Sequence, residues 1–154
     1  MLRATPKSWF SWSYHIHEGA RRVATVDVAW VRERARVDIA GIEYELGREG
    51  LARGAFFLRR EGVDLVRASK PSAFLRRFEI DCGGVRFGLR ARGPFSRGFV
   101  VVDGRQVLGG IAPERIFSRK ATVNLPKSMP LEVQVFLAWL VIVMWKRASN
   151  ASHS

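Results

Sequence analysis

The sequence predicts a mainly antiparallel β domain that ends in a single, wholly apolar helix. Residues 8–118 contain short runs of β-forming composition separated by glycine-containing turns, and no amphipathic helix interrupts them. Such a series is typical of a sandwich or barrel rather than of alternating strands and helices. The chain has 154 residues, of which 47% are hydrophobic and 11% aromatic, which favours one domain with a packed core.

The expected strands follow from the runs between these turns. They cover residues 9–14, 23–31, 36–46, 55–60, 63–68, 75–82, 85–92, 99–102, 106–108 and 115–118. Gly41 lies inside one run and predicts a kink or bulge there. We expect residues 1–7 to be a lead-in, residues 8–147 to form the domain with a helix at 129–147, and residues 148–154 to be a disordered polar tail.

The Gly83-Gly84 pair is the strongest hairpin signal, and its two-residue loop fixes a register. On one face this register pairs apolar residues: Cys82 with Val85, Ile80 with Phe87, and Phe78 with Leu89. The other face carries Asp81 opposite Arg86, Glu79 opposite Gly88, and Arg77 opposite Arg90, with Arg92 one step beyond.

The candidate binding residues are therefore Arg77, Arg86, Arg90 and Arg92. Arginine forks suit phosphate, so the cluster predicts an anion site for a lipid head group or another phosphorylated ligand. An alternative interpretation is a solvated basic face whose charges are paired by carboxylates of an adjacent strand. The residues alone leave both interpretations open.

The C-terminal segment has the signals of a buried or membrane helix. Ser128 can cap it, Pro130 suits its first turn, and Glu132 complements the helix dipole. The residues after Gln134, 135–145, have no polar face on a helix, so they are surrounded either by protein or by lipid. Residues 131–145 span about 22 Å, less than the roughly 30 Å of a hydrocarbon core, which favours burial in the domain over a tail anchor.

The net charge of +12 predicts an anionic partner, such as a membrane surface, an acidic protein or nucleic acid. Arginines outnumber lysines 21 to 5, as codon bias alone could produce. The charge is spread from Arg3 to Arg147 without a local basic block. This distribution disfavours a nucleic-acid partner, which we keep only as the alternative of nonspecific binding.

Catalytic and metal chemistry have little support. Cys82 is the single cysteine, and His15 and His17 form half of a metal site for which no third ligand is signalled. No nucleophile with a base, and no pair of carboxylates, is apparent. We expect a non-enzymatic protein without cofactor or metal. The first residues lack a signal-peptide pattern, so we expect a cytoplasmic location, with possible association with a membrane.

Four stretches give the chain a family resemblance: residues 65–72 (LVRASKPS), 76–80 (RRFEI), 84–89 (GVRFGL) and 103–111 (DGRQVLGGI). With the final apolar helix, they resemble the tubby C-terminal-like group, which includes tubby proteins, phospholipid scramblases and LURP-one-related proteins. The resemblance covers most of residues 9–147. It implies a closed antiparallel barrel of about a dozen strands around one C-terminal hydrophobic helix. It also implies a module that contacts anionic lipid, as tubby proteins do through basic residues.

Overall fold

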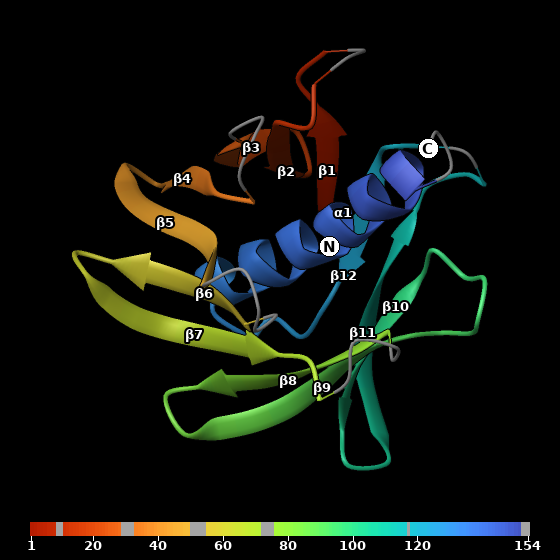
Figure 1. The fold of residues 1–154 in the computed structure, drawn as a ribbon. Coiled ribbons are helices and arrows are strands. Elements are labelled where there is room, and N and C mark those ends of the chain that lie inside the picture. Colours follow the sequence, from red (N-terminus) through yellow and green to blue (C-terminus); the bar gives the residue numbers. More distant parts are fainter. Residues whose placement is uncertain (9–10, 29–32, 50–54, 72–75, 117, 152–154) are drawn as a thin grey trace.

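The computed structural model describes residues 1–8, 11–28, 33–49, 55–71, 76–116 and 118–151. Over these residues, twelve strands close into an antiparallel barrel around one helix, which confirms the predicted fold class (Figure 1). The strands are β1 (Leu2–Pro6), β2 (Tyr14–Glu18), β3 (Arg21–Val28), β4 (Ala35–Ile39), β5 (Ile42–Glu49), β6 (Ala55–Arg60), β7 (Val63–Ser69), β8 (Arg77–Cys82), β9 (Val85–Ala91), β10 (Phe99–Asp103), β11 (Gln106–Pro113) and β12 (Ala121–Asn124). The helix α1 is Leu131–Ala151.

The connections of the barrel differ between its two ends. Each strand pairs with its neighbours in the chain, and β12 pairs with β1 to close the ring. At one end, which we call the turn end, five two-residue turns join strands at 19–20, 40–41, 61–62, 83–84 and 104–105. The opposite end, the loop end, has longer connections at 7–13, 29–34, 50–54, 70–76, 92–98 and 114–120.

Helix α1 fills the barrel. It begins at the turn end, where Leu131 lies near Arg21 and Ala40, and it ends among the loops (Figure 1). Every side chain from Val133 to Val143 is buried, and all of them except Gln134 belong to one core cluster that includes residues of all twelve strands. Trp139 is 1% exposed and meets the ring of Phe56 edge-on. The apolar helix is therefore enclosed by protein, as the first of the two interpretations predicts.

The start of the helix is fixed by polar contacts. The carbonyl of Pro130 accepts the first helical bonds, from the backbone N–H groups of Val133 and Gln134. The Gln134 amide, the one buried polar side chain of the described chain, donates to the Met129 carbonyl at 2.8 Å. In the part of the chain that the structure describes, no helix combines the length and hydropathy needed to cross a bilayer.

The hairpin prediction at Gly83-Gly84 is confirmed, and a second turn corrects the run at 36–46. Gly83 and Gly84 have φ of 59° and 91°, as a primed turn requires. Ala40 and Gly41 also have positive φ, 52° and 82°. Instead of a kink, these two residues form a tight turn that divides the run into β4 and β5.

The expected boundaries were wrong in four other places. Residues 1–7 are no lead-in, because β1 pairs with both β2 and β12, with Leu2 and Ala4 facing the core. The last strand is β12; of the expected strand at 115–118, residues 115, 116 and 118 belong to the preceding loop, and residue 117 lies outside the described chain. Helix α1 continues to Ala151, so residues 148–151 of the expected tail are helical. Of the expected strand at 9–14, residues 9–10 lie outside the described chain, and only Tyr14 belongs to β2.

Replacing Trp139 by alanine tests the central position of α1. The change removes a buried ring from the middle of the barrel and leaves a cavity, so we expect a loss of about 3–5 kcal/mol in the free energy of unfolding. Val63→Ala, at a site 61% exposed, is the control and should change stability by less than about 0.5 kcal/mol. Urea unfolding followed by circular dichroism measures both, and equal losses would contradict a helix buried in the core.

Candidate functional site

The hairpin of β8 and β9 places the predicted arginines on the outer surface. The register is as predicted: Arg77 lies opposite Arg90, and Asp81 lies opposite Arg86. The inner face buries Phe78, Ile80 and Leu89 almost completely, which holds this register in place. Cys82 and Phe87 are half-buried, whereas Val85 at the tip is 66% exposed.

Three of the four arginines share one property. Arg77, Arg90 and Arg92 are exposed and form no ion pair with a carboxylate of the described residues. We call these three the arginine face. Arg86, which lies nearer the turn end, differs because its Nε lies 3.8 Å from the carboxylate of Asp81. The alternative of native carboxylate pairs therefore describes Arg86 and not the other three.

The neighbouring strands explain why the arginine face lacks partners. Val100 on β10 lies opposite Arg90, and Gly110 on β11 lies opposite Val100. The row that runs from Arg77 through Arg90 thus continues into residues without charge. Arg77 and Arg90 therefore face each other and not an acidic residue, and Glu79, two residues from Arg77 on the same face, forms no ion pair with either of them.

Arg92 extends this row through two glycines. A Cβ atom at Gly98 would lie 3.1 Å from Arg92 Cδ, and one at Gly110 would lie 3.0 Å from Arg92 Nη2. The side chain of Arg92 therefore lies against positions where larger residues would displace it. Its guanidinium is held beside Gly110, across the sheet from Arg90.

A second group of cations, at the loop end, was not predicted from the sequence. Arg97 donates to the carbonyls of Ile116 and Ser118, both at 2.9 Å, and its guanidinium lies 4.5 Å above the ring of Trp145. The indole N–H of Trp145 donates to the Arg97 carbonyl at 2.8 Å. Burial lowers the pKa of Arg97. These contacts fasten the end of α1 to the loops, so Arg97 is a structural residue.

Two further cations lie where α1 leaves the barrel. Arg147 forms a two-pronged pair with Glu33, with distances of 3.0 Å and 2.6 Å. Burial lowers the pKa of Lys70, and the charges of Arg147 and Arg76 lower it further. No sequence signal distinguishes these residues from other loop cations, since their meeting depends on how the helix exits.

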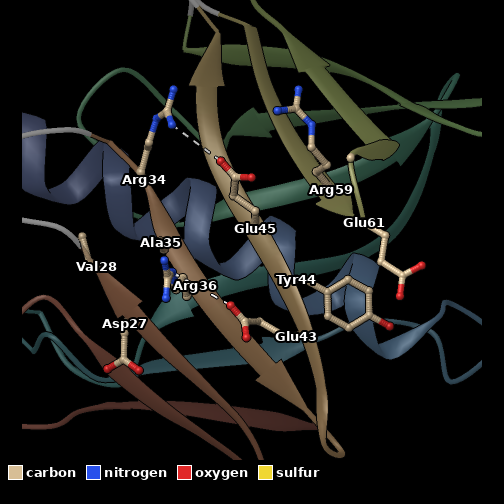
Figure 2. Close-up of a pocket in the computed structure, with 11 residues that line it drawn as sticks. Asp27, Val28, Arg34, Ala35, Arg36, Glu43, Tyr44, Glu45, Arg59 and Glu61 are labelled. Carbon is tan, nitrogen blue, oxygen red and sulfur yellow. Dashed lines mark ion pairs between the residues drawn. The ribbon is translucent and has the colours of Figure 1, made fainter.

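The outer surface of β3 to β6 contains a hollow lined by charges of both signs. Figure 2 shows its lining, in which Arg34 lies 3.7 Å from Glu45 and Arg36 lies 3.9 Å from Glu43. Asp27, Glu61 and Arg59 complete the charged residues of the lining. Four carboxylates face three arginines, so the hollow does not suit an anion, unlike the arginine face.

The predicted metal half-site gains no further ligand. His15 and His17 lie edge-to-face with ring centroids 6.3 Å apart, and His15 Nδ1 lies 3.4 Å from both Thr25 Oγ1 and Arg22 Nη1. Among the residues that the structure describes, no group of three metal-ligating side chains is present. Cys82 is a half-buried free cysteine, and burial raises its pKa.

Fold and surface together define a closed antiparallel barrel that encloses its own C-terminal helix and has, on its outer wall, arginines that form no ion pair with the described carboxylates. Comparison of the chain with protein-family models, with curated proteins and with solved structures gave no match.

Tyr14 supports the loops from inside the barrel. Its side chain is fully buried, and its hydroxyl donates to the Arg119 carbonyl at 3.0 Å. Burial raises the pKa of Tyr14 from 10.0 to about 12, although the nearby Arg119 opposes this shift. The hydroxyl therefore stays protonated in the folded protein at pH values where it ionises in the unfolded chain.

This raised pKa predicts how stability depends on pH. The unfolded chain loses the Tyr14 proton first, so the contribution is fully present below pH 10 and is lost as pH rises towards 12. Two pKa units correspond to about 2.7 kcal/mol. Tyr14→Phe should remove this alkaline loss and cost about 1 kcal/mol at neutral pH, where it deletes a hydrogen bond. Urea unfolding of both proteins between pH 8 and about pH 12 measures the difference, and parallel pH curves would contradict it.

Proposed function

We propose that the protein is a non-enzymatic, tubby-like binding module that holds phosphate groups of an anionic lipid surface, or of another phosphorylated ligand, against the arginine face. One observation carries the proposal. Arg77 and Arg90 on β8 and β9, and Arg92 directly after β9, are exposed and lack carboxylate partners among the described residues.

The repulsion between Arg77 and Arg90 favours the binding of an anion. Like charges directly opposite in an antiparallel pair destabilise a sheet, and Arg77 and Arg90 are such a pair. A phosphate between them replaces this repulsion by charge-assisted hydrogen bonds from two guanidinium groups. Because their strands are fixed by the core, little backbone conformational entropy is lost when the ligand binds.

The resemblance to the tubby C-terminal-like group supports the same partner. A closed barrel around a hydrophobic helix is the fold that this resemblance implies, and tubby proteins bind phosphoinositide head groups through basic residues. One fold serves many functions, so the arginine face carries the proposal and the resemblance adds to it. We place the module in the cytoplasm, at the surface of a membrane.

Replacing Arg77 and Arg90 together by glutamine tests the proposal. We expect affinity for vesicles of phosphatidylcholine and phosphatidylserine, and for soluble inositol hexakisphosphate, to fall about tenfold or more. Thermal stability should stay the same or rise slightly, because the like-charge pair is gone. Sedimentation with vesicles and isothermal titration calorimetry measure the two affinities.

The matched control is Arg21→Gln with Arg60→Gln. Both arginines are exposed, lie next to turns at the turn end, and form no ion pair with a carboxylate of the described residues. This variant loses the same net charge, so it should weaken binding only through the general field. Equal effects of the two double variants would show that the arginine face is no specific site.

A further inference from the structure

Two loops at the loop end hold large apolar side chains in water. Phe95, in the connection from β9 to β10, is 98% exposed, and Ile116, in the connection from β11 to β12, is 78% exposed. They are the two most exposed of the large hydrophobic residues that the structure describes. Figure 1 shows the green and cyan loops that carry them at the end of the barrel where α1 terminates.

The two loops form one unit. Arg97 of the first loop donates to the carbonyls of Ile116 and Ser118 in the second, both at 2.9 Å. Within the first loop, the N–H of Arg92 donates to the Gly98 carbonyl at 2.9 Å, and Arg76 Nη1 donates to the Pro94 carbonyl at 3.1 Å. We call Phe95 and Ile116 on these fastened loops the apolar tip.

The charges around the apolar tip have one sign. Arg92, Arg115 and Lys120 are exposed and form no ion pair with a carboxylate of the described chain. The two loops contain one described carboxylate, Glu114, and Arg3 neutralises it with its Nε at 2.7 Å. The exposed cations of these two loops therefore lack carboxylate partners among the described residues.

We propose that the apolar tip inserts into an anionic membrane, with Phe95 and Ile116 entering the acyl boundary while Arg92, Arg115 and Lys120 contact lipid phosphates. Aromatic and aliphatic residues flanked by cations are the composition that binds such interfaces. The inference rests on the proposed function, because Arg92 belongs both to the arginine face and to the first loop. It adds the depth and the direction of docking, with the loop end towards the lipid.

The shape of the apolar tip favours lipid over a protein partner. A stable protein interface buries roughly 800 Å² on each side with closely fitting surfaces. Two side chains that protrude from separate loops offer no such flat patch. They suit a fluid layer that closes around each of them, and the long arms of the cations can reach phosphates above it.

Phe95→Ser tests insertion with vesicles of phosphatidylcholine and phosphatidylserine. We expect the partition coefficient to fall about tenfold, as loss of a buried aromatic ring predicts, and Phe95→Ser with Ile116→Ser to lower it further. Val63→Ser is the matched control, since Val63 is 61% exposed at the turn end, and it should bind like the parent chain. The ratio between parent and Phe95→Ser should persist at high salt, where the electrostatic share is screened.

A fluorescent label reports depth independently of affinity. In a Cys82→Ser background, a nitrobenzoxadiazole group on Phe95→Cys should shift to the blue and brighten when vesicles are added. The same label on Val63→Cys should not change, because the turn end faces away from the lipid.

The outcomes separate this inference from the proposed function. Vesicle binding with no effect of Phe95→Ser and no change of the label overturns insertion and leaves the arginine face intact. Binding of inositol hexakisphosphate without vesicle binding also overturns insertion alone, and leaves a soluble phosphorylated ligand as the partner. If the parent chain binds neither vesicles nor inositol hexakisphosphate, the proposed function is overturned as well.

Discussion

Helix α1 is apolar on every side from Val135 to Val143, so in water this part needs a complete enclosure, and the strands need something to enclose. Trp139, Phe136 and the other buried residues of α1 fill the space that twelve inward-facing strand surfaces leave at the barrel axis. Neither part can bury its apolar surface alone. Closure of the ring by the pairing of β1 with β12 is the other half of this constraint, because a gap would expose both the helix and two strand edges.

The direction of α1 makes the two ends of the barrel unequal. Five two-residue turns leave the turn end with little chain that could be rearranged, whereas the loop end has longer connections that the helix terminus organises. Two sets of contacts attach those loops to the helix: Trp145 donates to the carbonyl of Arg97, and Arg97 donates to the carbonyls of Ile116 and Ser118. The end that presents Phe95 and Ile116 is thus fixed by the same burial that fixes the barrel.

How far the sequence predicted this structure depended on whether a feature was local. The Gly83-Gly84 register and the apolar helix are encoded by neighbouring residues, and both were predicted correctly. Strand β1 is not apparent from the sequence, because two apolar residues, Leu2 and Ala4, are too few to show a strand-like alternation. Its partner β12 is also more than 100 residues away in the chain. Gly41 alone predicts a kink or bulge, and the two-residue turn is not apparent from the sequence because alanine, here Ala40, rarely adopts positive φ. The apolar tip and the contacts of Arg97 arise where distant loops meet, which no local pattern reports.

The filled interior also restricts where a ligand can be held. The axis of the barrel is occupied by buried side chains such as Trp139, Leu140 and Val141, so a small molecule would have to displace the core. Over the described residues the ladder is closed, so no free strand edge can accept a peptide as an added strand. Binding is left to the outer wall and the loop end. The hollow beside Glu45 is lined by four carboxylates and three arginines. The arginine face and the exposed cations of the Phe95 and Ile116 loops, in contrast, have no ion pair with a carboxylate of the described residues. Arg92 is common to both of these unpaired groups, which is why we treat them as one surface with one class of partner.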